Sequence, residues 1–456
     1  MSRVLILFFA PVFQKSIPNI YHQFAKSFQN HGHDVLLVNN FIHNKSNGHF
    51  EDGLVKKIID FTPDLIISYN HVMNQEIYEN TQCPLVVIEA DTVEAFPNLD
   101  LLKKFQSRIY LGIVNTNRYN IIKENLPFIS KDKIMIIKNS TILEPKSVNQ
   151  DINISCIATL IGIGSSNLSK AIIQNLYEDD YINNFKKIFH KALNNWNDVK
   201  KEDLNLLQCS YVEFFHFMSF YTRLYTLDNI ASLGLNVYGH FFNLESILNL
   251  NDLFFSLKND KVLSIFDNQN IYNRSKLSIN VHFIHNIIDK KYSGYSWRVP
   301  DIMATNSCLV STFCPALDQD FGKWVKIPQF SNRHEAYDLC KKLLAEENLR
   351  KDIVAGSQLA IKEGKFTFYD RVEEIEQIFN LKKSDAKSEI SYEFLINNVM
   401  QNKEINNKQS ASDPNCNLDV GDFYKKNSLI NIINRIRINL FRKIRNKPLM
   451  HIVKKV

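Results

Sequence analysis

Short apolar runs alternate with helix-compatible stretches through the first 140 residues, and this alternation constrains the fold more than any other feature of the sequence. The runs are too short and too uniformly apolar for surface helices, whereas strands buried on both faces of a parallel sheet have this composition. Right-handed crossovers through the intervening helices then predict a doubly wound α/β domain. The predicted strands are residues 4–10, 34–39, 64–69, 85–90, 108–114 and 133–138.

The second half of the chain repeats the pattern after a polar linker at 141–153. A long stretch without strand signals, residues 167–232, predicts a helical insertion. The predicted strands here are 154–161, 235–239, 261–266, 277–283, 308–313 and 324–328, and the predicted helices are 332–346, 348–362 and 368–380. The predicted organisation is therefore a first Rossmann-like domain at 1–145, a second at 154–380 with its insertion, a loose linker at 381–428 with one short helix near 390–400, and a tail at 429–456.

The charge of the chain is concentrated at one end. The net charge is +6, yet residues 425–456 hold ten Lys and Arg and no acidic residue, so the body is slightly acidic. This argues against a nucleic-acid-binding body, which would carry a basic stripe on the fold itself. Seven scattered cysteines without zinc spacing predict reduced thiols. The apolar run at 4–10 is interpreted as a buried strand and not as an export signal, and no run reaches the ~20 apolar residues of a spanning helix.

The basic tail predicts an amphipathic helix. Its apolar residues follow helical spacing, with basic residues between them: Leu429, Ile433, Ile436, Leu440 and Ile444. Such a helix can lie on an anionic membrane surface, which predicts a cytoplasmic protein held peripherally on the inner face of the cell membrane. A helix packed on the body or on a partner protein is the alternative.

A segment around residue 298 predicts a nucleotide site. A loop with Gly294 precedes a predicted helix, for which Ser296 is the expected N-cap. Arg298 and Asp301 follow three residues apart. An arginine fork suits phosphate, and a carboxylate can accept two hydroxyl hydrogens from a ribose. An ordinary helix-start arginine and a carboxylate that complements the helix dipole are the alternatives.

Other polar residues are candidates for the same donor. Lys276 and Asn280 flank a predicted strand on the same side as Ser278 and could face a diphosphate, or simply make that face polar. Arg223 lies before the Gly239 strand and could equally be a solvated helix arginine. The pair Gly162 and Gly164 is interpreted as a tight turn. No Asp-x-Asp metal motif stands out, so no metal and no separate cofactor is predicted, and arginine, lysine and backbone N–H groups would neutralise the phosphates.

Two residues of the first domain are candidates for a general base. His71 and Asp91 each follow a predicted strand. An inverting transfer needs a base to remove the acceptor hydroxyl proton, whereas a retaining transfer does not, and the sequence leaves the stereochemistry open. Turn or capping chemistry is the alternative for both residues.

The region 223–380 resembles the donor-binding segment of group-1 glycosyltransferases, in particular the spore-maturation-type (CgeB-like) branch. The resemblance rests on 233–239 (LGLNVYG), 276–281 (KLSINV), 294–299 (GYSWRV), 308–312 (CLVST), 347–350 (ENLR), 355–356 (AG) and 366–371 (FTFYDR). It implies a GT-B fold, with two Rossmann-like domains facing a cleft and the nucleotide sugar bound by the second. Asp301 stands where this family typically has Glu, and Asn306-Ser307 replaces its small glycine turn.

These observations predict an enzyme that transfers a hexosyl or related sugar from a nucleotide-diphosphate donor to a glycan or lipid-linked envelope acceptor, as in polysaccharide biosynthesis. Two alternatives share the architecture. A sugar-nucleotide epimerase would release a changed sugar without an acceptor, and an inactive binding protein would retain the fold without turnover.

Overall fold

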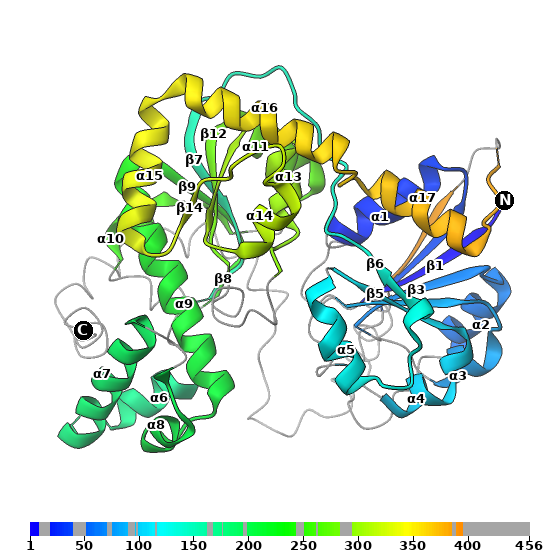
Figure 1. Cartoon of the computed structure of the whole chain (residues 1–456), viewed down its shortest axis with the longest axis horizontal. Helices are drawn as coiled ribbons and strands as arrows, with labels where there is room; N and C mark the ends of the chain where they lie inside the picture. The colour runs from blue at the N-terminus through cyan, green and yellow to red at the C-terminus, as the bar shows by residue number, and fades with distance from the viewer. Residues whose placement is uncertain are drawn as a thin grey trace, which may run out of the picture.

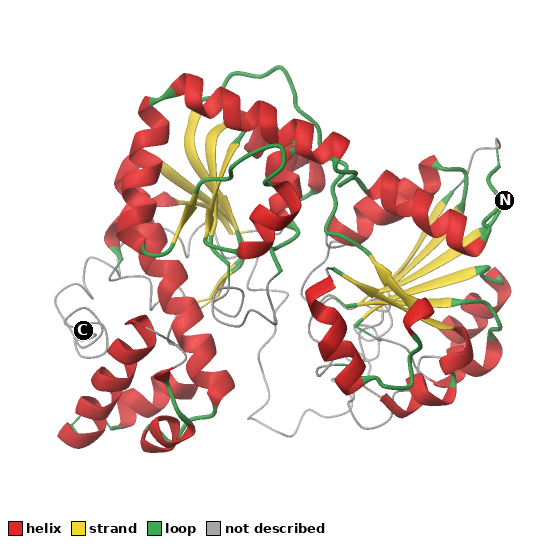
Figure 2. Cartoon of the chain, viewed as in Figure 1, coloured by secondary structure: helices red, strands yellow, loops and turns green. Residues whose placement is uncertain are grey.

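Two parallel sheets, each with helices on both faces, form the two lobes of the chain (Figures 1 and 2). The structure is a computed structural model that describes residues 1–8, 19–39, 52–70, 75–89, 96, 99–114, 116–161, 167–175, 177–194, 198–242, 250–260, 263–282, 294–384 and 389–394. The predicted fold class, two Rossmann-like α/β domains, is confirmed. The predicted tail at 429–456 lies outside the described residues.

The first sheet contains every strand predicted for it, in the order β15-β2-β1-β3-β4-β5-β6, with all neighbours parallel. Apolar side chains on both faces bury the inner strands β1, β3, β4 and β5, as the composition requires, whereas the edge strand β6 is partly exposed. The strands are β1 (Arg3–Phe8), β2 (Asp34–Asn39), β3 (Leu65–Tyr69), β4 (Leu85–Ile88), β5 (Ile109–Ile113) and β6 (Ile134–Ile136). The helices between them are α1 (Asn19–Asn30), α2 (Asp52–Phe61), α3 (Gln75–Asn80), α4 (Leu99–Lys104) and α5 (Tyr119–Asn125).

The chain returns to the first lobe after completing the second (Figure 1). Helix α17 (Phe368–Phe379) packs on α1, and its buried Phe368 contacts Phe24 at a ring distance of 5.3 Å. Strand β15 (Ile390–Phe394) then pairs in parallel with β2 at the edge of the first sheet. The prediction of a loose linker with a short helix near 390–400 was therefore wrong for 390–394. The first lobe includes 368–384 and 389–394 as well as the N-terminal residues, which the predicted boundary at 380 does not capture.

The second sheet has the order β11-β9-β7-β12-β13-β14, again entirely parallel. The strands are β7 (Ile152–Ile157), β9 (Leu235–Gly239), β11 (Leu257–Asp260), β12 (Ser275–Asn280), β13 (Cys308–Thr312) and β14 (Gln329–Phe330), and β8 (Leu160–Ile161) pairs separately with β10 (Phe241–Phe242). Two predicted strands were wrong. The predicted strand 324–328 lies just before β14. The predicted strand 261–266 overlaps the start of helix α11 at Ile265, where Ser264 caps the helix and accepts a hydrogen bond from the backbone N–H of Asp267.

Helices account for the rest of the second lobe. The insertion is helical as predicted, and its long helix α9 begins at a capping box formed by Ser210 and Glu213. Buried aromatic rings, among them Phe185, Phe189 and Phe217, join α7 to α9. The insertion helices are α6 (Asn167–Gln174), α7 (Asp179–Asn194), α8 (Lys201–Leu206) and α9 (Tyr211–Ile230). The others are α10 (Asn251–Ser256), α11 (Ile265–Arg274), α13 (Arg298–Met303), α14 (Pro315–Phe321), α15 (Arg333–Ala345) and α16 (Glu347–Glu363).

The lobes meet at a junction of polar and aromatic contacts. Thr141, in the link between the lobes, donates its hydroxyl hydrogen to Asp301 Oδ1 at 2.6 Å and forms a parallel bridge with Thr367. Trp297 of the second lobe stacks on Phe368 with ring centroids 6.2 Å apart and planes inclined by 5°. The segment around residue 298 is thus attached to the point where the chain crosses between lobes.

Candidate functional site

The strand order of the second sheet identifies where a ligand would bind. Successive strands run outward from β7 toward β9 on one side, and from β12 toward β13 and β14 on the other. The order therefore reverses between β7 and β12, and ligands of open α/β sheets bind outside the carboxyl ends of the strands at such a reversal. The carboxyl end of β12 is Asn280, one of the predicted site residues.

Asn280 is the centre of a buried polar cluster at this end. Its side chain is 1% exposed. Its amide oxygen accepts hydrogen bonds from Ser296 Oγ at 3.0 Å and from Arg298 Nε at 3.2 Å. Three residues that the sequence placed in the site are therefore brought together. Gly294 lies at the start of the same segment, where its carbonyl faces the Cys314 thiol at 3.7 Å.

The predicted capping role of Ser296 was wrong. Helix α13 starts at Arg298, its N-cap position is occupied by Trp297, and no side chain caps it. The Ser296 hydroxyl is engaged by Asn280 instead. Helix α13 has only 6 residues, so an anion-binding role for this segment rests on its side chains and not on the helix terminus.

Arg223 reaches the same strand ends from α9. Its side chain is 6% exposed and donates to the Val281 carbonyl at 3.0 Å and to the Thr159 carbonyl at 3.3 Å. Burial and the like charge of Arg298 lower the pKa of Arg223 to about 9. The buried Arg223 and the half-buried Arg298 therefore both donate to groups at the carboxyl end of β12, where an anion would stabilise both guanidinium groups.

His282 belongs to the cluster, although the sequence reasoning missed it. It is 2% exposed, its ring lies 3.0 Å from Asn280 Nδ2 and 3.2 Å from Ser311 Oγ, and its backbone N–H donates to Thr312 Oγ1 at 3.0 Å. Burial, followed by the charges of Arg298 and Arg223, lowers its pKa to about 3. Its position two residues after Asn280 could have indicated a shared location, since residues i and i+2 of an extended chain point the same way.

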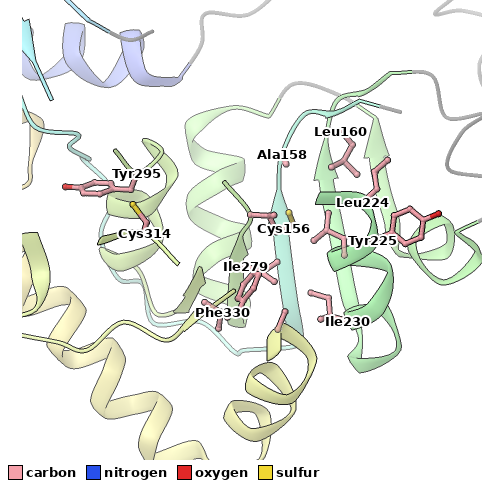
Figure 3. Close-up of a cluster of buried hydrophobic side chains, with 14 of the residues drawn as sticks. Cys156, Ala158, Leu160, Leu224, Tyr225, Ile230, Ile279, Tyr295, Cys314 and Phe330 are labelled. Carbon is pink, nitrogen blue, oxygen red and sulfur yellow. The ribbon is translucent and has the colours of Figure 1, made fainter. Parts of the chain in front are cut away.

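Apolar side chains support the cluster from within the sheet. Figure 3 shows Cys156 of β7, Leu224 of α9 and Ile279 of β12 in the hydrophobic core of this lobe, with Tyr295 and Cys314 beside each other at its edge. The Tyr295 hydroxyl donates to Asp320 at 2.7 Å, and its carbonyl accepts from Asn139 at 2.6 Å. The segment that carries Arg298 is therefore fixed on both sides.

Asp301 points to the lobe junction. It is 6% exposed, and its Oδ1 accepts from Thr141 at 2.6 Å and from Gln23 at 3.3 Å. Burial raises its pKa to about 7, against the hydrogen bonds from Thr141 and Gln23 and the charge of Arg298, which lower it. The carboxylate is thus used by the protein itself, and its role as a ribose ligand stays a prediction.

The remaining candidates lie elsewhere or outside the described residues. Lys276 lies near the amino-terminal end of β12, and Asn280 is at the other end of the strand. The Lys276 ammonium donates to Asn153 Oδ1 at 3.0 Å, so the structure does not bring it to the cluster. His71 and Asp91, like the glycine pair at 162 and 164, lie outside the described residues.

A buried ion pair occupies the corresponding end of the first sheet. Glu89 follows β4 directly and is 2% exposed, and Arg118 is 5% exposed. Arg118 Nε donates to Glu89 Oε2 at 3.0 Å, and its Nη2 donates to Oε1 of the same carboxylate. This bidentate pair fixes the backbone at the point where the chain enters the segment that contains Asp91.

Metal chemistry finds no support within the described ranges, which contain no group of three or more His, Cys, Asp or Glu suited to an ion. Burial raises the pKa of Cys156, and raises that of Cys314 to about 11, so these thiols near the cluster are poor nucleophiles at neutral pH. Among the helices that the structure describes, none combines the length and apolarity needed to cross a bilayer.

No family model matches the chain, and no curated protein matches it in sequence. Similar solved structures include a glycosyltransferase from Rickettsia africae (12% identity, TM-score 0.47, covering 83% of this chain and 98% of that one). Others are sucrose-phosphate synthase from Thermosynechococcus elongatus (9%, 0.48, 82% and 98%) and WaaG, a glycosyltransferase involved in lipopolysaccharide biosynthesis (8%, 0.44, 82% and 99%). At these identities and scores the likeness carries no argument about chemistry, and the fold rests on the strand order given above.

Proposed function

We propose that the protein is a glycosyltransferase that moves a sugar from a nucleotide-diphosphate donor to a hydroxyl acceptor. The observation that carries this proposal is that Arg223 and Arg298 both hydrogen-bond to the carboxyl end of β12, at the strand-order reversal of the second sheet. The resemblance of 223–380 to the donor segment of group-1 glycosyltransferases, of the spore-maturation-type branch, supports the same function.

The chemistry of sugar transfer fits a pair of arginines. The acceptor oxygen forms a bond to the anomeric carbon while the bond from that carbon to the diphosphate oxygen breaks, and the diphosphate leaves with increased negative charge. Guanidinium groups held in a desolvated site stabilise that developing charge without reorganising. Arg298 and Arg223 would bind the phosphates, with Asn280, Ser296 and Gly294 shaping the site around them.

Asp301 and the two candidate bases complete the proposal. Asp301 binds a ribose only if it exchanges Thr141 and Gln23 for the sugar hydroxyls, which requires a shift at the lobe junction. His71 or Asp91 removes the acceptor proton if the transfer inverts configuration. In a retaining transfer the departing diphosphate takes that proton.

Nucleotide binding tests the donor site directly. We expect UDP or GDP to raise the melting temperature of the wild-type protein, because a ligand that binds only the folded state stabilises it by about 2.7 kcal/mol at 100 times its Kd. Arg298→Ala should abolish this shift. Arg274→Ala is the matched control, because Arg274 pairs with the exposed Asp151 away from the reversal point. If no nucleoside diphosphate stabilises the wild-type protein, the proposal is wrong.

Turnover then separates the three functions that share this architecture. A transferase releases nucleoside diphosphate from a donor panel only when an acceptor is supplied, apart from slow hydrolysis. An epimerase releases a changed sugar without an acceptor. A binding protein is stabilised by the nucleotide and turns over no donor.

We also propose a glycan or lipid-linked envelope acceptor and a cytoplasmic location on the inner face of the cell membrane. The support is the ten basic residues within 425–456, each of which contributes roughly 1 kcal/mol near an anionic surface. Deletion of 425–456 should move the protein from the membrane fraction to the soluble fraction. An unchanged distribution would contradict membrane association through the tail.

A further inference from the structure

Three neighbouring polar side chains at the ends of β12 and β13 are almost completely buried. Asn280 is 1% exposed, His282 2% and Ser311 0%. Buried polar groups in stable proteins are hydrogen-bonded, because an unpaired one costs about 1–3 kcal/mol. The contacts among these three therefore determine how each side chain is oriented.

The Asn280 amide has two chemically different ends in two different surroundings. Its nitrogen lies 3.0 Å from His282 Nε2 and 3.3 Å from Ser311 Oγ. Its oxygen accepts from Ser296 and from Arg298. If the amide were turned over, its NH₂ group would face the Arg298 guanidinium, and two donors would then oppose each other.

His282 favours the observed orientation only while its ring is neutral. A neutral imidazole has one nitrogen that can accept the hydrogen of the Asn280 amide, whereas an imidazolium has donors on both sides. Among the described residues, the charged groups that act on the ring are Arg298 and Arg223, and together with burial they oppose protonation. The arginine pair thus maintains the ring state that keeps the amide oxygen toward Arg298.

We infer that His282 and Ser311 are positioning residues, which orient the Asn280 amide so that its oxygen fixes the Arg298 guanidinium for a diphosphate. This inference rests on the proposed function, because the diphosphate is that of the donor. The Asn280 amide oxygen accepts from Nε of Arg298, so the two terminal nitrogens of this guanidinium group would donate to the phosphate oxygens.

Diphosphate affinity tests this role. His282→Phe keeps a ring but loses the acceptor, and it should weaken binding of UDP, GDP and inorganic pyrophosphate about tenfold, the value of one charge-assisted hydrogen bond. His282→Gln retains an acceptor and should recover most of the affinity. Ser278→Ala is the matched control, because Ser278 is buried on the same strand but bonds to Ser155 and Ser307.

The outcomes distinguish this inference from the proposed function. If the wild-type protein binds diphosphates and His282→Phe binds them equally well, or if Ser278→Ala weakens binding as much, the positioning role is refuted. If the wild-type protein binds none, the donor proposal fails. In that case nitrogen NMR of the His282 ring, with the signals assigned by their loss in His282→Gln, still tests the orientation of the Asn280 amide. A ring that stays neutral from pH 5 to 8 supports this orientation, and protonation of the ring in this range refutes it.

Discussion

Asp301 provides the sharpest test of the lobe junction, and the informative change is Asp301→Asn. The carboxyl group is buried where α13, α1 and the linking segment meet, and the same oxygen accepts from Thr141 and Gln23. Asparagine has nearly the same shape and retains that acceptor, but it has no proton to lose. The substitution therefore removes the ionisation and leaves the two hydrogen bonds.

The magnitude follows from the two pKa values. The pKa of Asp301 is raised by burial to about 7 in the folded chain, against 3.8 for an unperturbed aspartate. The unfolded chain therefore loses this proton first, and the stability contributed by the protonated group falls as the pH rises from about 4 to about 7. The total loss is ~4 kcal/mol, of which about 2.5 kcal/mol falls between pH 5 and pH 8.

Urea unfolding at pH 5 and pH 8 measures this effect. Asp301→Asn should gain about 2.5 kcal/mol in free energy of unfolding relative to the wild-type protein between the two pH values. Asp151→Asn is the control, because the hydrogen bond from Arg274 lowers the pKa of Asp151 and the group is ionised throughout this range. If the free energies of unfolding of Asp301→Asn and the wild-type protein differ by the same amount at both pH values, the reasoning is refuted.

Two further predictions concern buried polar groups. Arg118→Met leaves the Glu89 carboxylate buried without its bidentate partner, and it should lower the free energy of unfolding by about 3–5 kcal/mol. A loss below 1 kcal/mol in urea titrations would contradict this prediction. Tyr272→Phe removes a buried hydroxyl that has no hydrogen-bond partner within the described structure, so the stability of this variant should change little. Tyr295→Phe removes the hydroxyl that donates to Asp320 Oδ2, which leaves this carboxylate its ion pair with Lys138 at 3.4 Å, and the loss of a hydrogen bond to a charged group should cost about 1.5–3 kcal/mol. Equal thermal shifts for the two tyrosine variants would show that the Asp320 bond contributes nothing.

The strands of the first sheet could be predicted from the sequence because their signal is local. A run such as Val4–Phe8 is apolar at every position, and only a strand covered on both faces buries such a run within so few residues. The signal fails where a short apolar run is ambiguous. Residues 261–266 resembled a strand, yet the Ser264 cap starts a helix there. Residues 390–394 gave no clear sign of pairing because β2, their partner, lies about 350 residues away.

The site was only partly predictable for the same reason. The residue types around 298 indicated a phosphate site, because an arginine fork beside a short polar loop suits an anion wherever the loop lies. The sequence could not tell that Asp301 turns toward Thr141 and Gln23, since those partners are far from it along the chain. It also could not identify His282, whose role depends on Ser311 from the neighbouring strand and on Arg223 from α9.

The sequence by itself determined two parallel α/β lobes and the residue types of the candidate site, because hydrophobic periodicity and side-chain chemistry are properties of neighbouring residues. Only the tertiary structure decided which of those residues meet at the end of β12, which join the lobes, and that α17 and β15 complete the first lobe. Such contacts depend on the strand order and on the crossing of the chain between lobes, and neither is encoded in any one segment.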